Sequence, residues 1–422
     1  MVCRCTESAW SAISAIVARR ARVFGVSNAY GMPIVAILGD GQLARMMQTE
    51  AIELGIETRL LAREPDASAA QVIADVRIGD YTNLGDVESI AKGADAVTFD
   101  HEHVPNEHAQ LLIDEGVVVE PRPNALLYAQ DKLEQRRRLK ALGAPVPEFA
   151  PINTEADAEA FWNVVNGEVC VKATRGGYDG HGVWFPASIS EMLDLVRTVD
   201  VPLMAERKIG FDRELSAMVA RNRSGEVRAW PVVESRQEGG VCRVAIAPAP
   251  GLDPELAREC EQLACRIAEE LDVTGVLAVE LFETDGRVQV NELAMRPHNT
   301  GHWTQDGCVT SQFEQHLRAV LDWPLGATTP TAPVTVMVNT LGGEARPEMP
   351  VAQRVAEVMR RHPQAKVHLY GKDFRAGRKL GHINVAAESL DEALTVAEDA
   401  AHFIVHGTWR DAAHTANNAK GE

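Results

Sequence analysis

Short apolar runs alternate with amphipathic stretches along the chain from Pro33 onwards. Ile34–Leu38 is a continuous apolar run that ends at a pair of glycines, which is typical of a buried parallel strand. Gln42–Leu54 has the periodicity of a helix, and Glu57–Ala62 and Ala96–Phe99 have the pattern of further strands. This alternation predicts an α/β layer with right-handed crossovers.

Two changes of pattern divide the rest of the chain. A strongly charged helix is predicted over 130–142 and is followed by the proline-rich stretch 143–151, while a second breaker-rich stretch covers 326–333. Between them lie apolar strands and a long helix that begins after Asp253. We therefore expect three domains, at 32–131, 132–326 and 327–415. A disordered, dispensable extension is expected before them, at 1–31, and a tail after them, at 416–422.

The third of these domains has a mixed pattern. Strands are predicted at Val334–Asn339 and Val367–Tyr370, and a helix is predicted near Leu390–Val405. These elements indicate a small α/β domain at the C-terminal end, and no internal repeat is visible in the sequence.

Composition narrows the function classes. The 422 residues include 42 Lys and Arg against 60 Asp and Glu, a formal charge of −18, so we expect no nucleic-acid partner, and an anionic ligand needs a local basic pocket. Seven scattered cysteines without metal-type spacing indicate reduced thiols and a cytoplasmic location. No apolar run approaches the roughly 18 residues of a membrane span, so no membrane partner is expected.

A glycine turn follows the first predicted strand. Gly39 to Ala44 matches GxGxxA, which allows a phosphate to approach a helix N-terminus. Taken alone, the motif is compatible with a nicotinamide dinucleotide site or with a purely structural turn. The second strand ends at Ala62 and Arg63, without the acidic residue that a dinucleotide site favours.

A second glycine-rich segment follows a strand that carries Lys172. Four glycines fall within 176–182, and a lysine together with free backbone N–H groups suits a polyphosphate. The segment lacks the GK[ST] ending of a Walker A loop, and a flexible hairpin with an ordinary lysine is the alternative interpretation.

Two carboxylates are predicted to face each other across a hairpin. Glu280 lies in one strand and Glu292 in the next, with Asn291 beside it. Carboxylate and amide oxygens suit Mg²⁺, which also bridges ATP phosphates. A solvated pair of hairpin carboxylates is the alternative, but both residues lie within apolar strands.

Two further segments concentrate polar side chains. Residues 296–305 carry an arginine, two histidines, an asparagine and hydroxyl groups directly after the second hairpin strand. Lys372, Arg375, Arg378 and Lys379 place four cations within eight residues, which suits a phosphate monoester. Ordinary solvated loops are the alternative for both.

Together these segments resemble the ATP-grasp superfamily and, more narrowly, the N5-carboxyaminoimidazole ribonucleotide synthase family over about residues 33–410. The most specific pieces are 176–182 (GGYDGHG), 291–307 (NELAMRPHNTGHWTQDG), 311–319 (SQFEQHLRA) and 371–384 (GKDFRAGRKLGHIN). The chain departs from the family's usual residues at Asp100, His181, Gln237, Met295 and Thr300.

The resemblance implies a Rossmann-like N-terminal domain, a central ATP-grasp fold of the α+β type and a small C-terminal α/β domain. It implies that ATP and bicarbonate carboxylate 5-aminoimidazole ribonucleotide through carboxyphosphate, in the purine pathway to IMP. Mg²⁺, with Mn²⁺ as a substitute, would be the cofactor, ATP the co-substrate, and a homodimer the assembly.

The resemblance also assigns residues. The phosphates of ATP would meet Lys132, Lys172 and the glycine-rich loop Gly177, Tyr178, Asp179, Gly180, His181 and Gly182. Adenine and ribose would meet Glu206, Arg207, Lys208, Ile209, Glu214 and Gln237, and the metal site would comprise Glu280 and Glu292 with Asn291 beside them. Bicarbonate and the imidazole would be surrounded by Tyr178, Asp179, Arg296, His298, Asn299 and His302. The ribotide phosphate would bind to Gln42, Leu43, Lys372, Arg378 and Lys379.

Two other functions stay open on the sequence. A formate-dependent glycinamide ribonucleotide formyltransferase would share the fold and the acyl-phosphate chemistry. A nicotinamide-dependent oxidoreductase would instead depend on the glycine turn after the first strand.

Overall fold

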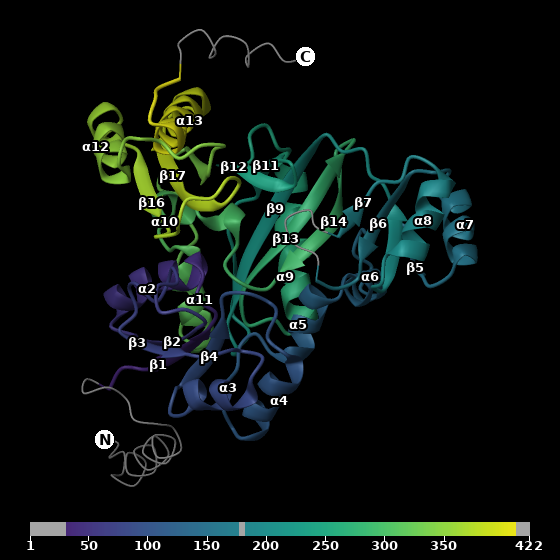
Figure 1. The fold of residues 1–422 in the computed structure, drawn as a ribbon, viewed down its shortest axis with the longest axis horizontal. Coiled ribbons are helices and arrows are strands. Elements are labelled where there is room, and N and C mark those ends of the chain that lie inside the picture. Colours follow the sequence, from purple (N-terminus) through teal and green to yellow (C-terminus); the bar gives the residue numbers. More distant parts are fainter. Residues whose placement is uncertain (1–30, 177–181, 411–422) are drawn as a thin grey trace, which may run out of the picture.

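A computed structural model describes residues 31–176 and 182–410 of the chain. The predicted disordered extension, apart from Gly31, and the predicted tail 416–422 lie outside these residues. Within them, the strands form two small sheets and one large sheet (Figure 1). No described helix is both long and apolar enough to cross a membrane.

The N-terminal domain is the predicted α/β layer. Its four-stranded parallel sheet has the order β3-β2-β1-β4, with bounds Ile34–Leu38 (β1), Glu57–Ala62 (β2), Asp75–Ile78 (β3) and Ala96–Phe99 (β4). The helices of this domain are Gln42–Leu54 (α2), Leu84–Ala91 (α3), Asn106–Asp114 (α4) and Pro123–Gln130 (α5). β1, α2, β2 and β4 have the predicted bounds, because glycines and polar turns mark their ends clearly.

A second four-stranded sheet, antiparallel throughout, follows the charged helix α6, Lys132–Ala141. The strand order is β5-β8-β6-β7, with bounds Phe149–Ile152 (β5), Val169–Ala173 (β6), Val183–Trp184 (β7) and Leu203–Arg207 (β8). Glu155–Val164 (α7) and Ile189–Thr198 (α8) pack on this sheet through Phe161 and Met192. This unit forms the right-hand part of Figure 1.

The large sheet has nine antiparallel strands and joins the central and C-terminal parts of the chain. Its order is β14-β13-β9-β11-β12-β15-β17-β16, with β10 paired to β9. The bounds are Arg213–Arg221 (β9), Val227–Ala229 (β10), Val233–Glu238 (β11), Val241–Ala247 (β12), Gly275–Thr284 (β13), Arg287–Ala294 (β14), Val334–Leu341 (β15), Lys366–Leu369 (β16) and Lys379–Ala387 (β17). β12 pairs with β15, Val244 opposite Val338, so the sheet continues across the stretch 326–333.

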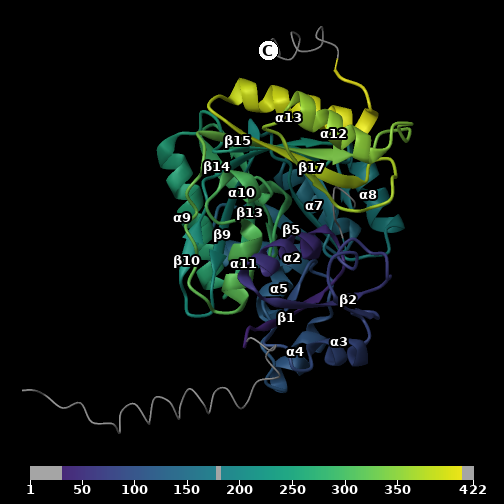
Figure 2. The same ribbon diagram turned by 90° about the vertical axis from the view of Figure 1, so that its left-hand side faces the viewer.

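Six further helical elements lie in the part of the chain that the structure describes, at Pro254–Glu270 (α9), Asn299–Gly301 (η1, a short 3₁₀ turn), Thr304–Gly307 (α10), Gln312–Val320 (α11), Val351–Arg361 (α12) and Leu390–His406 (α13). The Asp253 side chain caps α9 by accepting hydrogen bonds from the N–H groups of Glu255 and Leu256, as expected for a helix that begins there. α12 and α13 lie together on one face of β15 and β17 (Figure 2).

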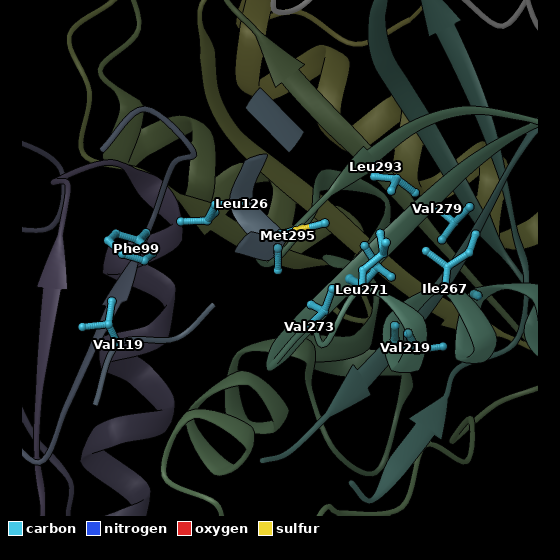
Figure 3. Packing of buried hydrophobic residues seen from close by; sticks show 14 of the residues in the cluster. Phe99, Val119, Leu126, Val219, Ile267, Leu271, Val273, Val279, Leu293 and Met295 are labelled. Carbon is cyan, nitrogen blue, oxygen red and sulfur yellow. The ribbon is translucent and has the colours of Figure 1, made fainter. Parts of the chain in front are cut away.

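One apolar core connects the N-terminal domain to the large sheet. Met295, directly after β14, lies between Leu126 of α5 and the side chains of Leu271 and Val273 (Figure 3). α11 makes a second connection, because its Phe313 belongs to the cluster around β1 and β2. The position of the segment that follows β14 is therefore fixed from both sides by burial of apolar side chains.

Candidate active site

A cavity of about 1250 Å³ lies where the N-terminal domain, the small antiparallel sheet and the large sheet meet. Predicted site residues from widely separated segments line this cavity, namely Gln42, Leu43, Lys132, Lys172, Glu206, Arg207, Lys208, Ile209, Glu214, Gln237, Glu280, Asn291, Glu292, Arg296, His298, Asn299, His302 and Lys379. The candidates Gly177, Tyr178, Asp179, Gly180 and His181 lie outside the described residues. Gly182 accepts a hydrogen bond from the Ala173 N–H, so the end of this loop returns to the strand that carries Lys172.

A buried ion cluster lies at one side of the cavity. Glu206 on β8 is 3% exposed and contacts Arg136 Nε at 2.9 Å and the ammonium of Lys172 on β6. Burial raises the pKa of Glu206, but Arg136 and Lys172 outweigh burial and hold the pKa at about 2. Arg136 is not among the predicted site residues, although its spacing of four residues from Lys132 puts both on one face of α6.

The predicted pair of carboxylates is present on the β13–β14 hairpin. Glu280 and Glu292 are directly opposite each other in the register. Lys132 Nζ lies 2.5 Å from Glu292 Oε1, and His298 Nε2 lies 3.2 Å from Glu280 Oε1. Burial raises the pKa of Glu280, yet His298 opposes this strongly enough that the net shift is downward, which favours the ionised form.

The oxygen atoms of the hairpin side chains suit a hard cation that also binds ligands from outside the protein. Among the described residues, no group of three or more His, Cys, Asp or Glu side chains could hold a metal ion without help. Two opposed carboxylates with the Asn291 amide 3.4 Å from Glu280 nevertheless suit Mg²⁺, because this ion takes one or two carboxylates and completes its shell with water and phosphate oxygens.

Another carboxyl group lies further along the large sheet. Glu214 on β9 accepts a hydrogen bond from the Gln237 amide of β11. Burial, helped by the nearby Glu280, raises the pKa of Glu214 to about 7. A carboxyl group in this state can pair with hydroxyl groups of a ligand as an acceptor or as a donor.

The segment after β14 is held by the N-terminal domain. Arg296 Nε donates to Glu102 Oε2 at 3.1 Å, and the Met295 N–H donates to the other oxygen of Glu102 at 2.8 Å. Burial lowers the pKa of Arg296, but Glu102 outweighs this and the net shift is upward. Glu102 is not among the predicted site residues, because its only signal in the sequence is its place in the charged segment that follows β4.

The glycine turn has a local function in the fold. Asp100 Oδ2 accepts a hydrogen bond of 2.5 Å from the Gly41 N–H, and a Cβ at Gly39 would lie 1.8 Å from Asp100 Oδ1. The glycines therefore make room for a carboxylate of the chain itself, where a dinucleotide site needs space for a pyrophosphate. Burial raises the pKa of Asp100 to about 7.

The C-terminal cations approach this same turn. The ammonium of Lys372 contacts the Gln42 amide oxygen across 330 positions of sequence. Burial, with Arg378 nearby, lowers the pKa of Lys372 to about 8. Lys379 begins β17 and lines the cavity, while Arg378 donates to the Asp373 carbonyl at 3.3 Å.

Comparison with known proteins agrees with this geometry. The ribonucleotide synthetase preATP-grasp domain matches residues 32–130, the ATP-grasp domain matches 137–313, and the phosphoribosylaminoimidazole carboxylase C-terminal domain matches 335–395. Fold and site thus define an ATP-grasp ligase, and the predicted fold class is confirmed.

The relatives identify the family more narrowly. The N5-carboxyaminoimidazole ribonucleotide synthase of Corynebacterium ammoniagenes is 57% identical over 389 residues, covering 90% of this chain and 94% of the relative. That of Mycobacterium tuberculosis is 50% identical over 383 residues, covering 90% and 89%. The chain belongs to the N5-carboxyaminoimidazole ribonucleotide synthase family, whose members are ATP-dependent carboxylating ligases of purine biosynthesis.

Solved structures support the same assignment. The N5-carboxyaminoimidazole ribonucleotide synthetase of Thermus thermophilus has a TM-score of 0.79 at 36% identity, covering 89% of this chain and 99% of that one. The enzyme of Aspergillus clavatus in complex with ADP and 5-aminoimidazole ribonucleotide has a TM-score of 0.79 at 31% identity, covering 88% and 98%.

Proposed function

We propose that this chain carboxylates 5-aminoimidazole ribonucleotide at its exocyclic amine, with ATP and bicarbonate as co-substrates. A bicarbonate oxygen attacks the γ-phosphorus of ATP, which gives carboxyphosphate and ADP. The amine then attacks the carboxyl carbon, the bond to phosphate breaks, and the products are the N5-carbamate and inorganic phosphate. Positioning and charge neutralisation dominate the catalysis of such phosphoryl transfers.

The observation that carries the proposal is the meeting of two basic regions in one cavity. Lys132 and Lys172 line the cavity at the hairpin, where Lys132 contacts Glu292 and Lys172 contacts the Asn291 amide oxygen. Lys379 lines it from the other region, where Lys372, itself outside the lining, contacts the lining residue Gln42. One region suits the phosphates of a nucleotide and the other suits a phosphate monoester. Arg296, His298 and His302 belong to the segment after β14, which lines the same cavity as the two basic regions.

The residue roles follow from this division. We assign the ATP phosphates to Lys132, Lys172, Asn291 and the loop Gly177–Gly182, and the nucleoside to Glu206, Arg207, Lys208, Ile209, Glu214 and Gln237. The 5′-phosphate of the ribotide is assigned to Gln42, Leu43, Lys372, Arg378 and Lys379, and the reacting groups to Tyr178, Asp179, Arg296, His298, Asn299 and His302. Glu280 and Glu292 would hold Mg²⁺, or Mn²⁺ in its place, which when bound neutralises charge on the phosphate oxygens.

The remaining assignments concern the setting of the reaction. We propose domain limits at 32–131, 132–326 and 327–415, which follow the changes of pattern in the sequence. We also propose a cytoplasmic homodimer that binds no nucleic acid. The free thiols of Cys170, Cys242, Cys260, Cys265 and Cys308 and the charge of −18 support the location and the lack of affinity for nucleic acid.

ADP release tests the reaction. With ATP, Mg²⁺ and 5-aminoimidazole ribonucleotide, turnover is expected to require added bicarbonate. Turnover that needs formate and glycinamide ribonucleotide instead would contradict the proposal in favour of the formyltransferase. NADH binding without protection by ATP against heat would favour the oxidoreductase.

A further inference from the structure

Helix α11 carries a segment, 311–319, that belongs to the family resemblance but has no role in the proposed reaction. Its apolar residues Phe313 and Leu317 pack into the core around β1 and β2. Gln312, the first residue of the helix, instead points towards the cavity-lining segment that carries His298 and His302, and its side chain is completely buried. A buried amide needs partners for its donors and its acceptor, so each contact of Gln312 constrains its orientation.

Two backbone groups fix which end of the Gln312 amide is oxygen. The His298 N–H donates to Gln312 Oε1 at 2.7 Å, and Gln312 Nε2 donates to the His298 carbonyl at 2.8 Å. The reversed amide would place a donor against an N–H and an acceptor against a carbonyl, so the backbone excludes it. Gln312 Nε2 also lies 2.9 Å from His302 Nδ1.

The tautomer of His302 follows from this geometry. Because Gln312 Nε2 can only donate, His302 Nδ1 must be the acceptor, and the proton of the neutral imidazole lies on Nε2. Burial first, and then the neighbouring His298 and Lys379, lower the pKa of His302 well below its ordinary value, which keeps the ring neutral.

The ring of His302 is also held in place by its surroundings. It stacks on Phe313 at 5.7 Å and on His382 at 4.9 Å, and Asn384 donates to its backbone carbonyl at 2.9 Å. α11 and β17 therefore restrain a residue that borders the cavity and is only 1% exposed. A preorganised donor of this kind pays little reorganisation cost during a reaction.

We infer that Gln312 is a positioning residue that sets His302 as a neutral Nε2–H donor towards the substrates. The inference rests on the proposed function in one respect, namely that His302 borders bicarbonate and the imidazole. As the amine attacks the carboxyl carbon, negative charge grows on the carboxyl oxygens, and an N–H donor stabilises it. On this assignment His302 is not the base that takes the proton from the amine.

The tautomer can be measured without any assumption about the reaction. Long-range ¹H–¹⁵N spectra of the full chain with ¹⁵N-labelled histidine are expected to show a pyridine-type Nδ1 and a pyrrole-type Nε2 for His302, assigned by His302→Gln. In Gln312→Glu, a carboxylate oxygen faces Nδ1, so Nδ1 is expected to become protonated. A protonated Nδ1 in the unaltered chain would overturn the inference.

The chain offers a matched control one turn along the same helix. Gln315 is also completely buried, and its amide makes the same pair of backbone contacts, at 2.7 Å to the Gly326 N–H and at 2.9 Å to the Gly326 carbonyl. Gln312→Met and Gln315→Met therefore remove comparable backbone contacts, but only the first releases a histidine.

The two methionine variants separate positioning from stability. Gln312→Met is expected to mix the tautomers of His302 and to lower kcat by about a hundredfold with little change in the KM for ATP, because one preorganised donor is lost. Gln315→Met is expected to lower the melting temperature while its His302 signals and kcat stay within about twofold of the unaltered chain. Equal effects of both variants on kcat would overturn the inference. If the unaltered chain showed no bicarbonate-dependent turnover, the proposed function would be refuted, and the tautomer measurement alone would decide whether Gln312 positions His302.

Discussion

Arg136 is expected to stabilise the fold through Glu206 more than any exposed arginine of α6 does. Its guanidinium donates to Glu206 at 2.9 Å and to the Asn291 carbonyl at 2.5 Å, and it is 2% exposed. Arg136→Met leaves Glu206 buried with Lys172 alone. Loss of one partner of a buried pair costs about 3–5 kcal/mol of unfolding free energy.

The structure also gives the pH dependence of this effect. The pKa of Glu206 is about 2, roughly two pH units below that of an ordinary glutamate, and each unit corresponds to about 1.4 kcal/mol. The ionised pair therefore adds about 3 kcal/mol above pH ~4.3, and this contribution is lost as the pH falls towards 2. Without Arg136, burial raises the pKa of Glu206. Glu206 of the variant therefore becomes protonated at a higher pH, and this protonation removes part of the destabilisation.

Urea unfolding at pH 7 and pH 4 measures both quantities, with coincident fluorescence and circular dichroism transitions as the condition for deriving a free energy. The difference between the unaltered chain and Arg136→Met is expected to be about 3–5 kcal/mol at pH 7 and smaller at pH 4. Arg137→Met is the control, since Arg137 is exposed and, within 31–176 and 182–410, pairs only with Glu134 on the same helix. It is expected to change stability by less than about 0.5 kcal/mol. A loss below about 1 kcal/mol, or an equal loss at both pH values, would refute the reasoning.

Three further changes test the site. Glu292→Gln is expected to nearly abolish ATP turnover at an unchanged melting temperature, because one carboxylate of the pair loses its charge, and a rate above about a tenth of normal would contradict the metal assignment. Lys379→Ala is expected to raise the KM for the ribotide roughly ten- to a hundredfold and the KM for ATP far less. The reverse pattern in steady-state kinetics would assign Lys379 to the nucleotide site instead. Gly39→Ala is expected to lower the melting temperature more than Gly93→Ala does, since both glycines have positive φ but only Gly39 would place a Cβ against Asp100, and equal losses would show that backbone strain alone matters.

Elements with a clear boundary signal could be predicted from the sequence. β1, α2, β2 and β4 have the predicted bounds, and the predicted opposition of Glu280 and Glu292 is confirmed in the register. In each case local pattern decides the outcome, because the period of the apolar residues and the flanking turn residues agree.

β17 was not predicted, although its two faces differ in polarity. Ile383 and Val385 belong to the core under α13, whereas His382 and Asn384 on the other face have polar partners, among them Tyr370 and Asp306. Residues 382–385 alternate as in a strand with one polar face, but this run is short and directly follows the cation-rich segment 372–379, so no local signal marks where the strand begins. Contacts between distant segments, such as Lys372 with Gln42, depend on how the domains pack and have no local signal at all.

The pairing of β12 with β15 affects how the chain can be divided. A cut in the stretch 326–333 would leave β12 (VCRVAIA) as the open edge of the large sheet, with unpaired N–H and C=O groups along an apolar strand. Such an edge is a template for intermolecular strand addition and aggregation. The C-terminal segment is therefore a protective cover for the sheet as well as a source of cations. A chimera between relatives is more safely joined in the chain after β17, because β12 and β15 then come from the same parent and their ladder stays intact.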